Sequence, residues 1–209
     1  VVGTLDIEAA IQEGRKRFEP GILADANRNI LYVDEINLLE DHIVDVLLDS
    51  AAMGVNTVER EGVSYAHPAR FVLVGTMNPE EGDIRPQLLD RFALSVTVTG
   101  EHEAKNRVEV IRRRLAYEKD ADAFTAAYAG EQEKLARQIT EAQARLAEAA
   151  VSEEILGKVA DMSIALGVDG HRADITVIKT ALTHAAFFER AEVTEEDLKA
   201  AAHLALPHR

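Results

Sequence analysis

The fold of this chain is decided by the stretch Ile30-Leu31-Tyr32-Val33-Asp34-Glu35, an apolar run that ends in two adjacent acids. A second apolar run, Phe71-Val72-Leu73-Val74-Gly75, is followed three residues later by the amide Asn78. Nearly continuous apolar runs of this length are typical of strands that are buried on both faces of a parallel sheet. The two stretches therefore predict a parallel α/β sheet with polar side chains at the carboxyl ends of its strands.

The segments around these two runs complete the pattern of an α/β domain. Helical periodicity over 40–52 places apolar residues on one side and acids on the other. Alternation over 56–66, with Glu61-Gly62 at its centre, predicts a β-hairpin. Apolar residues among charges predict a further helix over 5–17, with acids in its first turn. We expect the strands of the sheet at residues 29–33, 70–74 and 93–98.

The second half of the chain changes to helical periodicity. Ser152 and Thr194 each precede a cluster of acids and are typical helix N-caps. The segment 131–150 is polar with widely spaced apolar residues, and we expect it to project from the body of its domain. The chain is therefore expected to divide into an α/β domain over 1–100 and an all-α domain over 101–209. We expect helices at residues 103–117, 121–128, 131–150, 152–166, 173–191 and 194–206.

The composition excludes several classes of protein. A hydrophobic fraction of 47% is too high for a disordered chain. The net charge of −14 argues against nucleic acid as a partner, because that role needs a basic face. The absence of cysteine rules out disulfides and thiolate metal sites and is compatible with the reducing cytoplasm, where we expect the protein to act. No apolar run reaches the roughly 18 residues that a membrane-spanning helix needs.

The acid pair and the amide are the residues that indicate a chemical activity. At the carboxyl end of a strand in a nucleotide hydrolase, an aspartate such as Asp34 holds Mg²⁺ through water. The glutamate that follows, here Glu35, polarises the attacking water. The alternative is that the two acids cap the following helix. Asn78 can orient the same water, although Asn78-Pro79 is also a turn signal.

Two arginines are candidates for binding phosphate. Arg91 precedes the third expected strand, and a guanidinium supplied by a neighbouring subunit would neutralise charge in the transition state. The alternatives are that Arg91 forms an ion pair with Asp90 and that Arg85 takes its role. Arg172 begins a helix of the second domain and can reach over a bound nucleotide, or it can face solvent and pair with Asp174 or Asp169.

The histidines do not suggest a metal site. The seven histidines show no spacing typical of metal ligands. We expect His67, His171 and His184 to be packing or surface residues.

Several runs along the chain carry a resemblance to a known family. They are Phe18 to Ala24, Ile30 to Leu39, Val44 to Asp49, Val58 to Gly62, His67 to Gly75, Asn78 to Gly82 and Leu89 to Phe92. Taken together, these runs resemble the AAA+ subunit of magnesium chelatase, and the resemblance spans nearly the whole chain. The variant Gly75-Thr76-Met77-Asn78 is more similar to related AAA+ modules that are fused to an integrin-type metal-binding domain.

The resemblance implies a role for each candidate residue. Asp34 and Glu35 would be the Walker B acids, with Asp34 holding Mg²⁺ through water. Asn78 would be sensor 1 and Arg91 the arginine finger, while Arg172 would be sensor 2. The implied cofactors are ATP and Mg²⁺. The implied activity is an ATP-driven ring that helps another subunit insert Mg²⁺ into protoporphyrin IX, a step of chlorophyll and tetrapyrrole biosynthesis.

The resemblance also implies partners. They are further copies of the chain in a homo-oligomeric ring, a companion AAA+ and integrin-type subunit, and a porphyrin-binding chelatase subunit. Two other functions stay open. One is a non-hydrolysing AAA+ platform subunit of the same complex, and the other is a MoxR-like chaperone for metal-dependent partners.

The glycine-lysine phosphate loop of such an ATPase is not found in these 209 residues. The one Gly-Lys pair, Gly157-Lys158, is followed by Val159 and lacks the required spacing. We therefore expect an incomplete P-loop AAA+ parallel sheet with helices, followed by a helical lid domain. We also expect a preceding segment of roughly 100 residues to carry the phosphate loop, and these 209 residues alone neither to bind ATP tightly nor to fold robustly.

Overall fold

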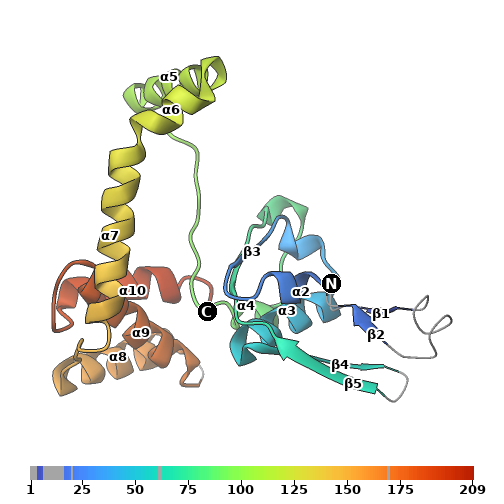
Figure 1. Cartoon of the computed structure of the whole chain (residues 1–209). Helices are drawn as coiled ribbons and strands as arrows, with labels where there is room; N and C mark the ends of the chain where they lie inside the picture. Colours follow the sequence, from blue (N-terminus) through green and yellow to red (C-terminus); the bar gives the residue numbers. More distant parts are fainter. Residues whose placement is uncertain (1–3, 7–16, 20, 61–62, 169) are drawn as a thin grey trace. The chain divides into compact units, whose positions relative to one another are not determined.

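The computed structural model describes residues 4–6, 17–19, 21–60, 63–168 and 170–209 (Figure 1). The chain divides into two compact units, Val1–Phe92 and Ala93–Arg209. Each unit has its own apolar core, and each is described by itself.

A two-stranded parallel sheet is the centre of the first unit. Strands β3 (Ile30–Val33) and β6 (Val72–Gly75) pair in register, from Ile30 opposite Val72 to Val33 opposite Gly75. One face of the sheet is open, since Ile30 and Val72 are 68% and 61% exposed. The two strands and their parallel pairing confirm the predicted parallel sheet. The predicted burial on both faces is wrong, because alternate apolar residues of each strand lie on the open face.

Helix α3 (Asp41–Met53) covers the other face of this sheet and closes the core. Its residues Val44, Leu47 and Leu48 are buried, as the helical periodicity predicts. The helix ends at Gly54, whose φ of 71° is the left-handed conformation that favours glycine at this position. The shorter helical turns of the unit are α2 (Ile22–Asp25), η1 (Ile36–Leu38), η2 (Pro79–Glu81) and α4 (Pro86–Leu89).

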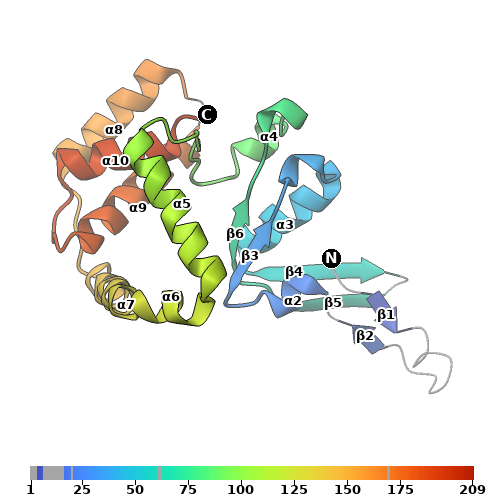
Figure 2. The same ribbon diagram turned by 90° about the horizontal axis from the view of Figure 1, so that it is seen from above.

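The predicted β-hairpin is confirmed. Strands β4 (Val55–Arg60) and β5 (Val63–Pro68) are antiparallel, with Thr57 opposite Ala66 (Figure 2). A second antiparallel pair joins β1 (Thr4–Asp6) to β2 (Arg17–Glu19).

The helix expected over 5–17 is wrong at both of its described ends. Leu5 lies in β1 opposite Phe18 of β2, and Arg17 also lies in β2. The interior of the expected helix, 7–16, is outside the described residues. The apolar residues of this segment start at every second position, which is the period of a strand rather than of a helix.

The strand expected over 93–98 is also wrong. The backbone N–H of Ser95 donates to the carbonyl of Leu204, 2.8 Å away in the last helix of the second unit. A strand exists only if a neighbouring strand takes its backbone hydrogen bonds. Among the described residues this segment has no such neighbour, and Val96 and Val98 remain exposed.

The second unit is all helical, and each of the six helices predicted for it is present. The ends of α8 and α10 follow their predicted caps, because the Ser152 hydroxyl accepts from Ile155 N and the Thr194 hydroxyl from Asp197 N. The helices are α5 (Ala104–Lys119), α6 (Ala121–Ala127), α7 (Ala129–Arg145), α8 (Glu153–Leu166), α9 (Arg172–Phe187) and α10 (Glu195–Ala205).

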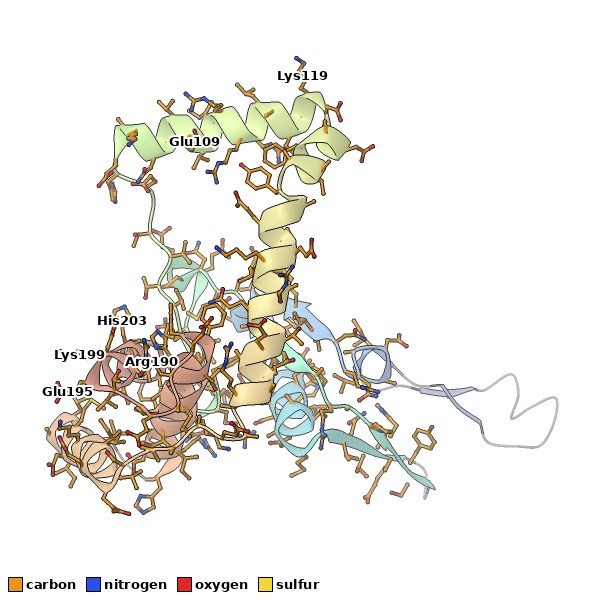
Figure 3. All side chains as sticks on the ribbon, turned by 60° about the vertical axis from the view of Figure 1, so that its left-hand side comes forward. Glu109, Lys119, Arg190, Glu195, Lys199 and His203 are labelled. Atoms are coloured by element: carbon orange, nitrogen blue, oxygen red, sulfur yellow. The ribbon has the colours of Figure 1, made fainter. Side chains whose placement is uncertain are left out.

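The core of the second unit lies between α8, α9 and α10. Small residues such as Ala181 and Ala201 are fully buried and let the helices approach closely, while Val159 and Val177 fill the space between them. The exposed face of α10 carries Glu195, Lys199 and His203, one turn apart (Figure 3).

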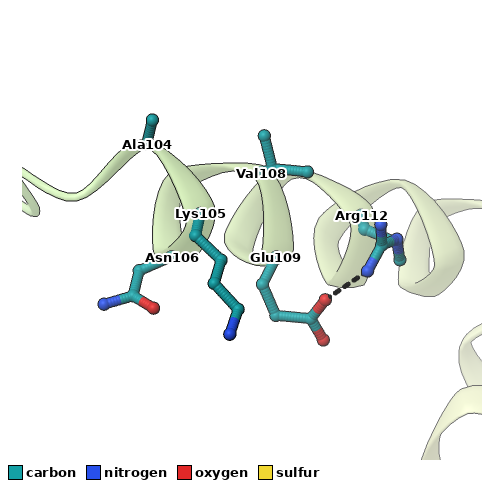
Figure 4. A pocket seen from close by; sticks show the side chains of 6 residues that line it. All are labelled: Ala104, Lys105, Asn106, Val108, Glu109 and Arg112. Atoms are coloured by element: carbon teal, nitrogen blue, oxygen red, sulfur yellow. Dashed lines mark hydrogen bonds and ion pairs between the residues drawn. The ribbon is translucent and has the colours of Figure 1, made fainter.

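Helix α5 is stabilised by its own side chains, since none of its residues is buried. Glu109 Oε2 accepts from Arg112 Nη1 at 2.6 Å (Figure 4). Glu109 Oε1 accepts from Arg113 Nε at 2.9 Å. Pairs at these spacings support an exposed helix. Helix α7 joins the α5–α6 pair to the core helices, and its N-terminal half extends away from them as expected (Figure 1). It ends at Arg145 rather than at 150, because Ala150 forms a β-bridge with Glu192. Among the described residues, no helix has both the length and the apolar character needed to cross a membrane.

Candidate active site

The carboxyl ends of β3 and β6 form one edge of the sheet, because the two strands run in parallel. Val33 lies opposite Gly75, so the residues that follow each strand are neighbours. The ladder continues past the strand ends, with Thr76 N donating to Val33 O at 3.0 Å and Ile36 N donating to Thr76 O at 2.8 Å. Asp34 and Glu35 therefore emerge beside the segment that leads to Asn78.

Thr76 links the two strand ends through its side chain. Its hydroxyl donates to Asp34 Oδ1 at 2.5 Å and accepts from the backbone N–H of Glu35 at 3.2 Å. The Tyr32 hydroxyl donates to the same Asp34 oxygen at 3.0 Å. Thr76 is not among the site residues predicted from the sequence. The signal in the sequence is its position directly after an apolar run, as Asp34 follows the other apolar run.

These contacts favour the ionised form of Asp34. The hydrogen bond from Thr76 lowers the pKa of Asp34 most, and the hydrogen bond from Tyr32 lowers it further. A carboxylate that stays ionised can hold a cation at neutral pH.

Glu35 has an unusual backbone. Its φ of 50° and ψ of 51° are left-handed, a conformation that costs a non-glycine residue about 1 kcal/mol or more. Glu35 precedes η1, yet its side chain makes no capping hydrogen bond to that turn. The alternative that this acid serves as a helix cap therefore has no support in the structure, and the Glu35 carboxylate is exposed at the edge of the sheet.

Asn78 serves as a turn residue and keeps a donor available. Its Oδ1 accepts from the backbone N–H of Glu80 at 3.2 Å and caps η2. Asn78-Pro79 therefore begins a turn, as this dipeptide predicts. Among the described residues, the Nδ2 group of Asn78 has no hydrogen-bond partner, so it can donate to a water or a ligand.

Arg91 is held by helix α3. Its Nη1 lies 2.8 Å from Asp45 Oδ1 and 2.9 Å from Asp49 Oδ1, and these two carboxylates are one helical turn apart. Arg85 Nη2 pairs with Asp41, one turn earlier on the same helix, at 2.6 Å. The acidic side of α3 therefore receives both candidate arginines of the first unit.

Arg172 lies in the second unit as the first residue of α9. It lines a groove of about 870 Å³ together with basic and apolar side chains that include Lys179, His184 and Ile175. The neighbouring Asp174 has Oδ2 3.3 Å from Nδ1 of His171.

The Gly157-Lys158 pair lies inside α8 and has a structural role. Lys158 Nζ donates to Glu154 at 2.7 Å and to Glu195 at 2.5 Å. A helical backbone has no free N–H groups to cradle a phosphate at this point, which agrees with the conclusion from its spacing.

The residues at the sheet edge fit Mg²⁺. Among the described residues, no group of three or more histidines and acids could hold a metal ion alone. Magnesium does not need such a group, because it binds through one or two carboxylates and completes its shell with water and phosphate oxygens. Asp34 supplies an ionised carboxylate, and the Thr76 hydroxyl adds a second oxygen close to it.

Comparison with known proteins shows which family the chain resembles. Residues 6–87 match the family model described as magnesium chelatase, subunit ChlI, and residues 157–209 match the model described as AAA lid domain. Over all 209 residues the chain is 56% identical to the magnesium-chelatase subunit ChlI homolog of Methanocaldococcus jannaschii, of which it covers 57%. Over its whole length the chain is thus similar in sequence to ChlI subunits of magnesium chelatase. This similarity confirms the resemblance found in the sequence.

Another ChlI relative and a solved structure agree with this similarity. The chain is 53% identical over 209 residues to the magnesium-chelatase 38 kDa subunit of Cereibacter sphaeroides and covers 63% of it. A crystal structure of a putative ATPase from Cytophaga hutchinsonii superimposes with a TM-score of 0.67 at 18% identity. That match covers 100% of this chain and 64% of the other, and it supports the AAA+ fold. The chain thus spans less than two thirds of these two ChlI relatives.

Proposed function

We propose that this chain carries the hydrolytic acids of an ATP-hydrolysing AAA+ motor subunit, in a magnesium chelatase-type complex that drives Mg²⁺ insertion into protoporphyrin IX. One observation carries the proposal. Asp34, Glu35 and Asn78 follow two adjacent parallel strands, and the Thr76 hydroxyl bonds to the Asp34 carboxylate and to the backbone N–H of Glu35. This is the edge at which open α/β sheets bind their ligands.

Each residue at the edge has a distinct task in this proposal. The Asp34 carboxylate, oriented by hydrogen bonds from Thr76 and Tyr32, holds Mg²⁺ through water. When bound there, Mg²⁺ neutralises charge on the phosphates of ATP. The Glu35 carboxylate accepts a proton from the attacking water. Asn78 orients that water with its Nδ2 donor.

The arginines complete the proposed cycle. Arg91 of a neighbouring protomer binds the phosphate oxygens and neutralises the charge that develops during transfer. Arg172, in a lid proposed to span 101–209, senses the nucleotide, and the lid then moves against the α/β core of 1–100. The resulting motion acts on the partners, which we propose to be a homo-oligomeric ring, a companion AAA+ and integrin-type subunit and a porphyrin-binding subunit, in the cytoplasm.

The hydrolytic role fits the site better than the role of a platform subunit. A platform needs Arg91 for its neighbour's site but has no use for an ionised Asp34 or an exposed Glu35. Both acids are kept in place here, at the cost of a left-handed backbone at Glu35.

The substitution Glu35→Gln in the complete protein tests this proposal. The variant should still bind ATP and should lose hydrolysis by roughly 100-fold or more, because an amide cannot accept the proton. ATP turnover and the nucleotide retained after gel filtration are the measurements, together with magnesium-protoporphyrin formation in the reconstituted complex. Glu40→Gln, at an exposed glutamate before α3, is the matched control. Unchanged turnover in the Glu35 variant would remove this residue from its role.

A further inference from the structure

We infer that Thr76 is a positioning residue that fixes both acids of the proposed ATPase site through one hydroxyl group. The effect of Thr76 on catalysis rests on the proposed function. The effect of Thr76 on the position of the two acids does not depend on that function. Nothing in the sequence marks Thr76 as more than a polar residue after a strand. Its role comes from the register of β3 and β6.

The Thr76 hydroxyl uses both of its hydrogen-bonding capacities on the acid pair. Its hydrogen goes to Asp34 Oδ1 at 2.5 Å, and its oxygen accepts the N–H of Glu35 at 3.2 Å. A hydroxyl has one donor and two acceptor positions, so one group can satisfy a carboxylate and an N–H at once. Valine, which has the same shape, can do neither.

Thr76 is itself held firmly enough to position other groups. Its backbone N–H donates to Val33 O at 3.0 Å, and its carbonyl accepts from Ile36 N at 2.8 Å. Gly75, directly before it, lies so close to Ile36 that a Cβ there would be 3.1 Å from that side chain. The backbone at the strand end is therefore packed tightly against the residues on either side of the two acids.

The bond to Glu35 N matters most because Glu35 is strained. A left-handed φ at a non-glycine residue persists only where the surroundings impose it. The Thr76 hydroxyl and the Thr76 carbonyl hold the N–H groups of two successive residues, Glu35 and Ile36. Losing the hydroxyl leaves the direction of the Glu35 side chain less well defined.

Tyr32 offers a control for the contact with Asp34 alone. Its hydroxyl reaches the same Asp34 oxygen at 3.0 Å, but none of its hydrogen bonds goes to Glu35. Tyr32→Phe therefore removes one bond to Asp34 and leaves the link to Glu35 intact. If Thr76 acts on both acids, its substitution should have the larger effect.

The first test needs no nucleotide. Millisecond hydrogen exchange of the complete protein is measured at the Glu35 amide for Thr76→Val, Thr76→Ser and Tyr32→Phe. We expect exchange to become severalfold faster in Thr76→Val and to stay near the wild-type rate in Thr76→Ser and Tyr32→Phe. Equal exchange rates in wild type and Thr76→Val would overturn the inference.

The second test measures turnover of the complete protein. Thr76→Val should lower kcat for ATP by about 10- to 100-fold, as is usual for residues that orient groups around a metal, while KM for ATP changes by less than about threefold. Thr76→Ser should recover most of the loss, and Tyr32→Phe should have a smaller effect. Thr57→Val, at an exposed strand threonine of the hairpin, controls for the loss of a hydroxyl as such.

Three outcomes of the turnover test have separate meanings. If Thr76→Ser is as impaired as Thr76→Val, the methyl group and its packing matter rather than the hydroxyl, and the inference fails. If Glu35→Gln abolishes hydrolysis while Thr76→Val behaves as wild type, the inference fails and the proposed function stands. If neither variant changes turnover, the proposed function fails, and the exchange experiment still decides the structural part.

Discussion

Arg91 and Asp45 are joined by a hydrogen bond of 2.8 Å between Nη1 of the guanidinium and Oδ1 of the carboxylate. Asp49 binds the same nitrogen at 2.9 Å. Among the described residues, the side-chain hydrogen bonds of Arg91 thus all go through Nη1, and the edge formed by Nε and Nη2 stays available. A guanidinium anchored in this way can still present two donors to a phosphate.

The geometry of Arg91 predicts that a positive charge at this position is not enough for ATP hydrolysis. Arg91→Lys keeps the positive charge but loses the planar fork, so ATP hydrolysis by the complete protein should fall by about 1,000-fold while ATP binding persists. Steady-state hydrolysis and equilibrium nucleotide binding are the measurements. Arg85→Lys, at the arginine that pairs with Asp41, is the control. If the Arg85 variant loses activity and the Arg91 variant keeps it, the role passes to Arg85.

The carboxylates that hold Arg91 should contribute little to stability. Asp45 and Asp49 have side chains that are 46% and 55% exposed, and exposed ion pairs contribute roughly 0–1 kcal/mol. Asp49→Asn should therefore change the free energy of unfolding of the complete protein by less than about 1 kcal/mol. Urea unfolding at low and high salt measures this. A loss of several kcal/mol would mean that the pair is structural.

Asp197 is a buried charged residue that we expect to be important for the stability of the second unit. It is fully buried, and its carboxylate accepts from His184 Nδ1 at 2.6 Å, from Arg190 and from Thr194 N at 2.9 Å. Asp197→Ala should destabilise the unit by about 3–5 kcal/mol, because it leaves these donors unpaired. Denaturant unfolding is the measurement, and Asp161→Ala, at an exposed position of α8, is the control. Equal stability of the two variants would contradict this account.

The same carboxylate predicts how stability depends on pH. Burial opposes the charge of Asp197, but hydrogen bonds from Arg190, His184 and Thr194 outweigh it and lower its pKa below the ordinary value. The unfolded chain takes up this proton near pH 3.9, before the folded chain does. The contribution of Asp197 is thus complete at neutral pH and declines as the pH falls below about 4. The free energies of unfolding of wild type and Asp197→Asn, measured between pH 7 and about 2.5, should converge as the pH falls. A constant difference would contradict the assignment.

Much of this fold could be predicted from the sequence, because local patterns determine it. The apolar runs at 30–33 and 72–75 and the helical periodicity after Gly100 are visible without any tertiary information. The expected helix over 5–17 failed because apolar residues among charges fit two periods. The expected strand over 93–98 failed because a strand needs a partner, and no local pattern tells where that partner is.

The sequence predicted which residues form the candidate site, but not the contacts that hold them in place. The position of Asp34 and Asn78 at one sheet edge followed from strand order. The role of Thr76 could not be predicted in this way, because it depends on the register of two strands about 40 residues apart in the sequence. The partners of Arg91 were missed for the same reason, since the neighbouring Asp90 was the partner considered and Asp45 and Asp49 are distant in sequence.

The central claim is that the acids of one protomer and Arg91 of its neighbour act on the same ATP. The most direct test mixes two inactive variants of the complete protein, Glu35→Gln and Arg91→Ala, and measures ATP hydrolysis. In a ring of mixed composition, about a quarter of the interfaces would join an intact Glu35 to an intact Arg91, so hydrolysis should reappear well above that of either variant alone. A mixture that assembles into rings and stays as inactive as its two components would contradict the account.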